Sequence, residues 1–557
     1  MDFYYIIAAI VTMIVVAYLL GIRDARKAKR YLQKKLSDNF GKAPDKQYKD
    51  EDFEHLKGYY LNHKNDFQID DTTWNDLDMD RVFVRTNYCL SAAGEEYLYY
   101  LLRTPSLVDD FEKQEKEVSY LQENDDIRKR LQLIFYEIGN NRKYSIYQYI
   151  RFLENVGNTG NVRHFAMLGL MGLSVVICFL NFKLGFILLI ALMLLNIFNY
   201  FKTKGDIDPY LTTYGYIMRV IKSVDAFSAV NDEAFSDTFK EMSQISKEFS
   251  GFKAGASILM APARMNSGGN PADLMMDYIR MVTHIDIIKF NQMYRELMKK
   301  MDSLDRILTL TGRLEAEISI ACFRESFKEN VCIPEFTKEG YNAKGLVHPL
   351  ISDPVCNDID TDKGLLITGS NASGKSTFLK TCAINSILSQ TIHTVLGKSY
   401  KAPLFRIFSS MALKDDLTSG ESYYIVEIKS LKRILDATKD ASSKVLCFID
   451  EVLRGTNTVE RIAASCQILK RFSAGNIMCF AATHDIELTE LLAGDYNMYH
   501  FEGNILDNDV HFDYEIKNGP ANNRNAIRLL GVLGYEDDIT EKAENMAQNF
   551  LKSGVWK

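Results

Sequence analysis

The sequence predicts an α/β domain with a mostly parallel sheet, preceded by an all-α region and by transmembrane helices. Two observations indicate the α/β domain. A short apolar strand runs into a glycine-rich turn and a helix, and two further apolar runs each end in polar residues. A third observation indicates the membrane helices, because the 557-residue chain contains two long apolar regions with almost no charge.

The overall composition is that of a globular protein. Hydrophobic residues make up 47% and charged residues 25%, which excludes a mainly disordered or fibrous chain. Lys and Arg number 66 against 73 Asp and Glu, so no basic excess indicates nucleic acid, and any DNA contact must be local or come from an oligomer. The 9 Cys form no C-x-x-C pair, which fits a reduced compartment and no zinc site.

The first apolar region, residues 3–22, is uncharged and long enough to cross about 30 Å of hydrocarbon as a helix. The positive-inside rule places its C-terminal end in the cytoplasm and the N-terminus outside. A cleaved signal peptide would carry its basic residues before the apolar run, so we expect an uncleaved anchor. The basic residues that follow this region are Arg23, Arg26, Lys27, Lys29, Arg30, Lys34 and Lys35.

The second apolar region has two arms, residues 165–180 and 184–201, separated by a break that contains Lys183. Each arm is slightly short but can span a bilayer with local adjustment. The pattern predicts a helical hairpin with both ends cytoplasmic and Lys183 at the outer face. The alternative is a hairpin buried in a soluble core. Three spans would put residues 23–163 and 202–557 on the cytoplasmic side.

A phosphate-binding loop is predicted after the apolar strand 364–368. The next eight residues read G-S-N-A-S-G-K-S and match G-x-x-x-x-G-K-[ST] at every position, and a helix follows. In this motif backbone N–H groups and a helix N-terminus surround the phosphates, Lys375 adds positive charge, and Ser376 can ligate Mg²⁺. The expected phosphate-binding residues are Gly369, Asn371, Ser373, Gly374, Lys375, Ser376 and Thr377.

Two further apolar runs predict neighbouring buried strands. Residues 444–449 end in Asp450, which can hold Mg²⁺ through water, and in Glu451, which can act as the general base for an attacking water. Residues 476–482 are followed by His484, which could touch the γ-phosphate; an isolated histidine there would more often be only packed or exposed. Together these strands predict a ligand at the carboxyl edge of a parallel sheet.

An antiparallel hairpin is expected beside this sheet, formed by residues 498–502 and 510–516. Turn-forming residues separate the two runs.

The surroundings of these motifs resemble one family. Residues 450–458 read D-E-V-L-R-G-T-N-T and resemble the D-E-[IV]-G-R-G-T-[SN]-T signature of the MutS family of mismatch-repair ATPases. Residues 415–428 look like that family's D-D-L-x-S-G-x-S-T-F-x-V-E-M segment, and residues 482–489 are similar to its A-T-H-x-x-E-L-T stretch. The H-P-L and N-D-I triplets within 348–359 fit as well, and Asn371 matches the family's phosphate-binding loop. The resemblance implies an ABC-type P-loop ATPase domain.

A weaker resemblance extends towards the N-terminus. Residues 69–105 look like the start of the family's helical core, and helix-rich sequence resumes after the membrane hairpin. The expected domains are an anchor (1–22), a basic and polar linker (23–69), the first part of a helical core (70–163), the transmembrane hairpin (164–202), the second part of the core and lever (203–335) and a MutS-type P-loop ATPase domain (336–557).

Some features depart from the family pattern. No mismatch-reading domain is expected between the anchor and the core, and the F-Y-E tripeptide at 135–137 is interpreted as a chance match to the family's mismatch wedge. Leu453 stands where the family has Gly, and Tyr423 where it has Thr. Ser370 and Ser373 replace the usual Pro and Gly of the loop, but no phosphate or metal ligand is lost.

The resemblance also implies a dimer in which each signature segment faces the partner's nucleotide. Carried over, Ser422, with Ser419 and Gly420, would contact the γ-phosphate in trans; the alternative is an ordinary polar turn. Val355 is the candidate apolar contact for adenine. The implied cofactors are ATP and Mg²⁺, and the implied partners are a second copy of the chain and DNA. The two apolar regions add the lipid bilayer as an expected partner.

The sequence therefore predicts an integral membrane protein with a cytoplasmic MutS-like ATPase. Nucleotide binding would close the dimer and hydrolysis would reopen it, acting on mismatched or branched DNA. The alternative is a membrane-tethered, ATP-driven scaffold that acts on a protein partner. An ABC transporter subunit is disfavoured, because three spans are few and no L-S-G-G-Q appears.

Overall fold

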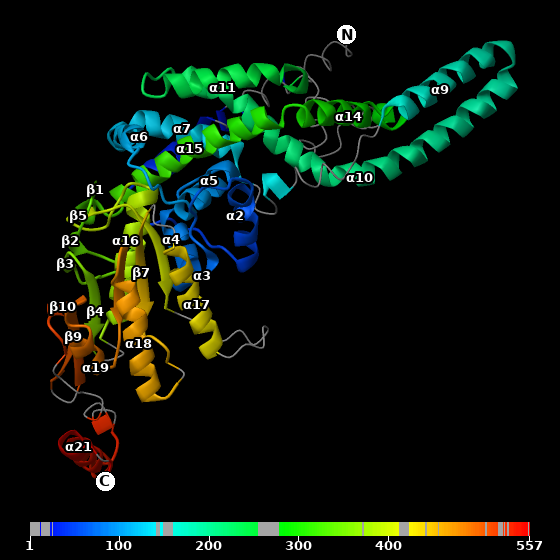
Figure 1. Cartoon of the computed structure of the whole chain (residues 1–557). Coiled ribbons are helices and arrows are strands. Elements are labelled where there is room, and N and C mark those ends of the chain that lie inside the picture. Colours follow the sequence, from blue (N-terminus) through cyan, green and yellow to red (C-terminus); the bar gives the residue numbers. More distant parts are fainter. Residues whose placement is uncertain are drawn as a thin grey trace. The chain divides into compact units, whose positions relative to one another are not determined.

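The protein forms two compact units in the computed structural model (Figure 1). The helical unit comprises Met1–His63, Asn87–Tyr100 and Lys116–Cys322, and the sheet unit comprises Lys64–Thr86, Leu101–Glu115 and Phe323–Lys557. The structure describes residues 12, 20, 23–24, 26–140, 145–148, 160–253, 278–369, 373–411, 423–439, 443–454, 456–506, 509–521, 527, 530–531, 534–554 and 556. The predicted anchor, 3–22, falls almost entirely outside these residues, so its prediction stands on the sequence.

Long helices build the helical unit. They are α2 (Asp50–Asn62), α7 (Asp125–Ile138), α9 (Val162–Leu180), α10 (Phe182–Val230), α11 (Ser236–Glu248) and α14 (Ile285–Met298), and the helices α5 (Ala92–Arg103), α6 (Glu112–Glu123) and α15 (Met301–Glu325) each continue into the sheet unit. On α7 the apolar residues recur at helical spacing, and Phe135 is fully buried with its ring 5.2 Å from that of Phe227. The F-Y-E tripeptide is thus part of the helical core, where Phe135 cannot insert into DNA.

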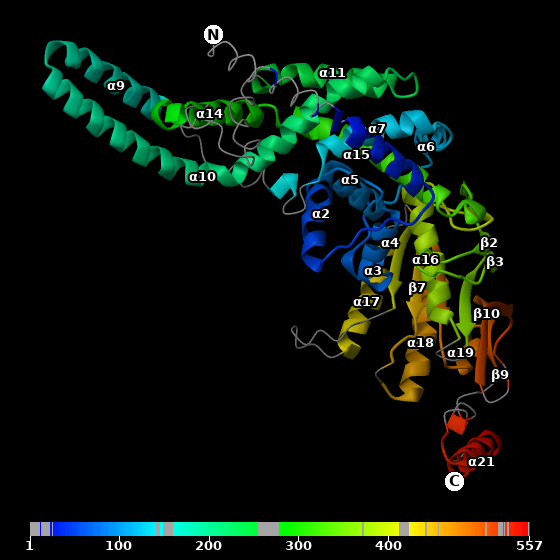
Figure 2. The same cartoon turned by 180° about the vertical axis from the view of Figure 1, so that it is seen from behind.

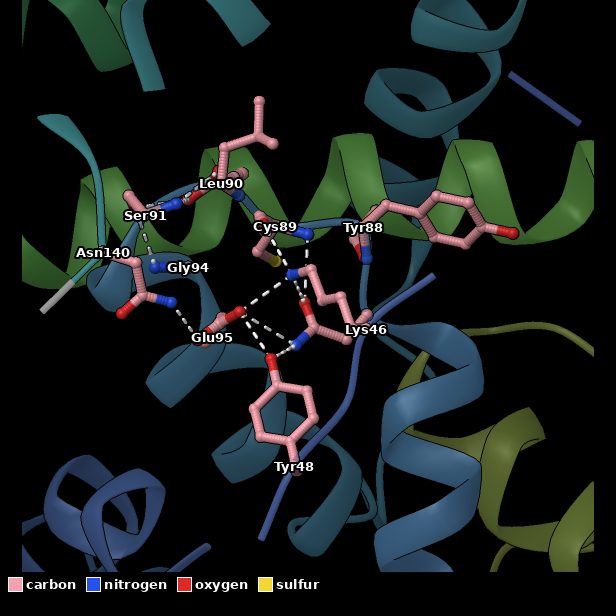
Figure 3. A network of polar contacts seen from close by, with 12 residues as sticks. Lys46, Tyr48, Tyr88, Cys89, Leu90, Ser91, Gly94, Glu95 and Asn140 are labelled. Atoms are coloured by element: carbon pink, nitrogen blue, oxygen red, sulfur yellow. Dashed lines mark hydrogen bonds and ion pairs between the residues drawn. The ribbon is translucent and has the colours of Figure 1, made fainter. Parts of the chain in front are cut away.

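The middle of the expected linker, at Lys46 and Tyr48, is folded onto this core (Figure 3). Glu95, buried at the start of α5, accepts hydrogen bonds from Lys46 Nζ at 2.8 Å and from the Tyr48 hydroxyl at 2.6 Å. Burial alone would raise the pKa of Glu95, but Lys46 and the hydrogen bonds outweigh it and lower the pKa. Residues 41–49 are therefore tied to the helical unit, and α2 follows them directly.

The hairpin helices α9 and α10 lie side by side (Figure 1). Their turn falls at the predicted break, where Asn181 caps α10 by accepting a hydrogen bond from Leu184 N at 3.2 Å. Val162–Leu180 and Phe182–Ile207 are long and apolar enough to cross a membrane, and most of their residues are exposed. The second helix does not end where the apolar arm ends, because α10 continues to Val230 and packs against α7 and α11.

Two of the hairpin's polar residues fasten it to α14 and to the residues just before that helix. Asn196 Nδ2 donates to the Val282 carbonyl at 2.7 Å, and the Tyr200 hydroxyl donates to Asp286 at 2.7 Å. Because these groups are buried, their hydrogen bonds fix how α10 meets the rest of the helical unit.

A six-stranded sheet forms the centre of the sheet unit, in the order β10-β9-β4-β8-β7-β6. Its strands are β4 (Gly364–Thr368), β6 (Phe405–Ser410), β7 (Lys444–Asp450), β8 (Ile477–Ala482), β9 (Tyr496–Leu506) and β10 (Asp509–Asn518). Every neighbouring pair is parallel except β9 and β10, which form the predicted antiparallel hairpin. The mostly parallel sheet expected from the apolar runs is therefore present.

A second, smaller sheet was not anticipated. It has the order β1-β5-β2-β3, from β1 (Glu335–Phe336), β5 (Ser399–Ala402), β2 (Tyr341–Leu346) and β3 (Asn357–Thr361). The remaining helical elements of the unit are α3 (Asp71–Asp76), α4 (Met79–Thr86), η2 (Lys328–Asn330), α16 (Lys375–Thr391), α17 (Tyr423–Ala437), α18 (Thr458–Phe472), α19 (Glu487–Leu491) and α21 (Asp537–Ser553). Helix α16 contacts both sheets and is buried almost throughout, which explains why its apolar residues follow no single stripe.

Two stretches expected in the helical core belong to the sheet unit. The domain prediction placed 70–163 in one helical domain, but Lys64–Thr86 and Leu101–Glu115 cluster with the sheet. Trp74 is buried, the Arg103 guanidinium lies 4.2 Å from its ring centroid, and Arg103 also pairs with Asp71 at 2.6 Å. These partners are far apart in the linear pattern, so helical periodicity could not assign them to a unit.

Candidate nucleotide site

The glycine-rich turn joins β4 to α16, and its first and last glycines adopt positive φ. Gly369 has φ +141°, and a Cβ there would lie 2.6 Å from the carbonyl oxygen of Phe501. Gly374, at φ +103°, is the N-cap of α16. Both positions favour glycine, because the positive φ and the close neighbours leave little room for a side chain. Asn371 lies outside the described residues.

Lys375 is buried at the first position of α16, where it is 2% exposed. Its Nζ donates to the Gly369 carbonyl at 2.6 Å. Burial lowers the pKa of Lys375 to about 8, although the charges of Asp450 and Glu451 act in the opposite direction. The two carboxylates predicted at the end of β7 therefore lie within electrostatic reach of the loop lysine.

The carboxyl ends of β7 and β8 are adjacent, because Asp450 pairs with Ala482 in the parallel register. Glu451 N donates to the Ala482 carbonyl at 2.9 Å, which places Glu451 opposite the turn that carries His484. The His484 Nε2 is 2.8 Å from Glu451 Oε1. The structure thus brings together the predicted general base and the predicted histidine.

The charge of Glu451 is set by its neighbours. Burial would raise the pKa of this carboxyl, but the His484 hydrogen bond and the charges of Arg454 and Lys375 outweigh it, so the pKa lies below the usual value. Arg454 Nε contacts Glu451 Oε2 at 2.5 Å. The sequence prediction gave Arg454 no role. Its place in the D-E-V-L-R-G signature could have identified it as a site residue.

Glu427 is a second residue that sequence reasoning missed. It is 3% exposed on α17, and its carboxylate accepts the backbone N–H groups of Leu453 and of Arg454, the latter at 3.2 Å. Burial raises its pKa. Glu451 and Leu453 both have positive φ, at +63° and +60°, so Glu427 holds a turn in a conformation that costs side-chain-bearing residues energy. The V-E-I triplet around Glu427 was the signal in the sequence.

A pocket of about 230 Å³ adjoins the first turn of α16. It contains Val355, the predicted adenine contact, which is 39% exposed. Mostly apolar walls with a few polar groups suit a flat, aromatic base. The pocket is lined by Leu346, His348, Ile351, Asp353, Pro354, Val355, Asn357, Gly374, Thr377, Phe378, Thr381, Phe501 and Tyr514.

The remaining predicted site residues divide into two groups. Ser373 is buried, and Ser376 and Thr377 lie in the first turn of α16 with partial or full exposure, beside Gly374. The hydroxyl of Ser376 and the carboxylate of Asp450 are hard oxygen ligands, which is the donor chemistry that Mg²⁺ prefers. The predicted trans signature, Ser419, Gly420 and Ser422, falls outside the described residues.

Comparison with known proteins supports the resemblance. Residues 365–551 match the family model described as MutS domain V. The chain is 28% identical over 284 residues to a DNA mismatch repair protein MutS of Natronomonas pharaonis, covering 48% of this chain and 33% of that protein. It is 30% identical over 282 residues to a DNA mismatch repair protein MutS of Leptospira interrogans, covering 48% of this chain and 32% of that protein.

A third relative gives the same picture. The chain is 28% identical over 278 residues to DNA mismatch repair protein MutS 2 of Haloarcula marismortui, covering 44% of this chain and 29% of that protein. The chain thus spans about a third of the length of these curated relatives. The matched region contains the loop lysine, the strand-end carboxylates and the histidine described above. Over residues 365–551 the chain is therefore similar to domain V of the MutS family.

Proposed function

We propose that this protein is a membrane-anchored, MutS-like ATPase that hydrolyses ATP to ADP and phosphate. One observation carries the proposal: Lys375, Asp450, Glu451 and His484 gather at the carboxyl ends of parallel strands, beside a glycine-lined loop and an apolar pocket. In open α/β sheets, ligands bind at that edge. The relatives named as MutS lend the assignment further support.

The residues have distinct parts in this proposal. The loop N–H groups and Lys375 hold the β- and γ-phosphates, while Val355 and the other pocket residues receive the adenine. Glu451 is the general base for the attacking water, and its low pKa keeps it ionised at neutral pH. His484 holds Glu451 in place and reaches towards the γ-phosphate. Mg²⁺, held by Ser376 and by Asp450 through water, would neutralise charge on the phosphates.

The active form in this proposal is a homodimer. Ser422, with Ser419 and Gly420, contacts the γ-phosphate of the partner subunit, so that ATP binding closes the dimer and hydrolysis reopens it. Each site is then completed by two subunits.

The hairpin α9–α10 is the membrane segment of the proposal. Large apolar side chains along it are exposed, and lipid would cover them. Together with the sequence pattern at 3–22 and the flanking basic residues, this supports an integral protein whose ATPase domain lies in the cytoplasm.

DNA is the proposed ligand on the strength of the relatives, and a protein partner is the alternative. One observation favours the protein partner over mismatched DNA. Phe135 of the F-Y-E tripeptide is fully buried, so it cannot serve as a mismatch wedge. A membrane-tethered scaffold needs no wedge.

Turnover of the detergent-solubilised protein tests the enzyme. Glu451→Gln should retain ATP binding and lower turnover by about 10²–10⁴-fold, because a positioned general base is lost. Lys375→Ala should instead weaken the binding of ATP. Unchanged turnover in Glu451→Gln would remove Glu451 from this role.

The nucleic-acid ligand is tested with the same preparation. Stimulation of turnover by homoduplex, mismatched or branched DNA would support the DNA function. An ATP turnover rate that none of the three DNAs changes, in a preparation with active ATPase, would favour the scaffold.

A further inference from the structure

The histidine of the proposed site lies in a short turn between β8 and α19, and different groups hold the two ends of this turn. Before His484, Thr483 N donates to the Ile367 carbonyl of β4 at 2.9 Å, so the sheet fixes the backbone there. After His484 the chain enters α19, and α18 lies beside α19 (Figure 1 and Figure 2). Side chains of α18 can therefore hold the second end of the turn.

Arg461, in the first turn of α18, makes this contact with Asp485. Its Nε donates to Asp485 Oδ2 at 2.9 Å, and its Nη2 donates to Asp485 Oδ1 at 2.5 Å, so the guanidinium binds both carboxylate oxygens. Two parallel hydrogen bonds between planar charged groups fix their orientation as well as their distance. The side chains of Arg461 and Asp485 are 25% and 13% exposed, so most of the contact is shielded from water.

Asp485 also shapes the turn itself. Its backbone N–H donates to Thr483 Oγ1 at 3.1 Å, and its carbonyl accepts a hydrogen bond from Leu488 N at 3.2 Å. Because Asp485 directly follows His484, fixing its carboxylate to α18 limits how far the backbone of the histidine can turn. In the resulting position, His484 Nε2 lies 2.8 Å from Glu451 Oε1.

The main partner of Arg461 is Asp485 rather than Glu451. The Asp485 hydrogen bond is the largest cause that raises the pKa of Arg461, and the charge of Glu451 contributes less. Glu451 is contacted instead by Arg454 and His484. Arg461 therefore reaches the proposed general base through the turn that carries His484.

We propose that Arg461 is a positioning residue, which through Asp485 fixes the turn that directs His484 towards Glu451 and the γ-phosphate. This role rests on the proposed ATPase function. Arg461 touches no nucleotide in this arrangement, and its contact with Asp485 does not involve the phosphate-binding loop. Its loss should therefore slow the chemical step and leave the binding of ATP nearly unchanged.

Steady-state kinetics give the first test. Arg461→Ala and Asp485→Ala should each lower kcat by about 10- to 100-fold, the scale expected when a reacting group is misplaced by about 1 Å. The KM for ATP should stay within about twofold, because the loop that binds the nucleotide is intact. Arg471→Ala removes the same group at an exposed position in the last turn of α18, and this matched control should change neither value. A wild-type kcat in Arg461→Ala or in Asp485→Ala would overturn the inference.

Arg461→Lys separates the effect of position from the effect of charge. Lysine keeps the positive charge but cannot bind both carboxylate oxygens with a planar group, so the variant should have less than half of the wild-type kcat. More than half of the wild-type kcat would assign the effect to charge and overturn the positioning role. If the melting temperature of Arg461→Ala shows that it does not fold, Arg461→Lys replaces it in every comparison.

Double variants give the sharper test, because they show whether Arg461 acts through His484. If it does, Arg461→Ala should change kcat by less than about twofold in a His484→Ala background, since the group that it positions is gone. The double variant Arg461→Ala, Asp485→Ala should likewise have a kcat within about twofold of the slower single variant. Effects that multiply in either double variant would show that Arg461 acts independently of these residues and overturn the inference.

The single variant His484→Ala separates the two proposals. A wild-type kcat in His484→Ala would refute the role of the histidine in the proposed function, and the role of Arg461 with it. A lowered kcat in His484→Ala, combined with a wild-type kcat in Arg461→Ala, would refute the role of Arg461 alone.

Discussion

Burial gives Lys375 a pKa of about 8, so its charge varies within the range in which enzymes are usually assayed. A phosphate bound beside it stabilises the charged form and raises that pKa, so nucleotide binding takes up a proton above about pH 8. We expect ATP affinity to be constant below that pH and to fall by up to about tenfold per unit above it. Titration with a fluorescent ATP analogue measures this.

Lys375→Arg is the control for that pH dependence. A guanidinium remains charged throughout the range, so the variant should bind with an affinity that does not change between pH 8 and pH 10. A flat profile in the wild type would show that the charge of Lys375 does not limit binding.

Leu453 combines a buried side chain with φ +60°, where the family has glycine. Ala and Gly variants both lose the buried leucine side chain. Only Gly also removes the backbone strain of a positive φ, which is of order 1–2 kcal/mol. We expect Leu453→Gly to be more stable than Leu453→Ala by about 1 kcal/mol in chemical unfolding.

The same pair of variants at Gln467, an exposed position of α18, should show the usual opposite order, with Ala more stable than Gly. An Ala variant of Leu453 more stable than the Gly variant would mean that the turn relaxes when the leucine is removed.

Helices α9 and α10 approach closely at Gly185, near their turn. A Cβ on Gly185 would lie 2.3 Å from the backbone nitrogen of Cys178. Gly185→Leu should therefore force the helices apart and cost about 1–3 kcal/mol, measured as a lower melting temperature. Gly172→Leu on α9 is the control, because nothing lies within 4 Å of a Cβ there. Equal melting temperatures for the two variants would contradict this packing.

Elements with strong local signals could be predicted from the sequence, and those that depend on distant partners could not. The loop after β4, the ends of β7 and β8, and the turn at Asn181 each follow from a motif or from an apolar run with a defined end. The small sheet was missed because its strands are short, and three of them, β1, β2 and β5, have partners more than 40 residues away. The predicted end of helix α10 was too early, because the apolar arm ends at residue 201 whereas the helix continues to Val230.

The candidate site divides in the same way. Glu451 and His484 could be named because each follows an apolar strand, and the parallel register then brings them together. Glu427 could not be given a role, because its partners are backbone N–H groups of a turn 26 and 27 residues away. The V-E-I triplet marks Glu427 as part of a motif, but it does not show that the carboxylate binds backbone N–H groups.

At the scale of the whole molecule, the hairpin predicts behaviour in a membrane. We expect the protein to resist alkaline carbonate extraction, because Val162–Leu180 and Phe182–Ile207 expose apolar side chains along most of their length. Lys183, at the turn of the hairpin, should be labelled only from outside the cell. Recovery of intact protein in the soluble fraction would contradict the membrane proposal.

The sheet unit is assembled from three separate stretches of the chain, which bears on how the protein is made. Thr73 and Ser409 are 336 residues apart, so at about 5–20 residues per second the ribosome adds the partner of α3 roughly 20 to 70 seconds after α3 itself. During that interval the hairpin is synthesised, while α3 lacks the strand on which it will pack. The nascent chain thus has to keep an apolar segment from misassociating until β6 has been synthesised.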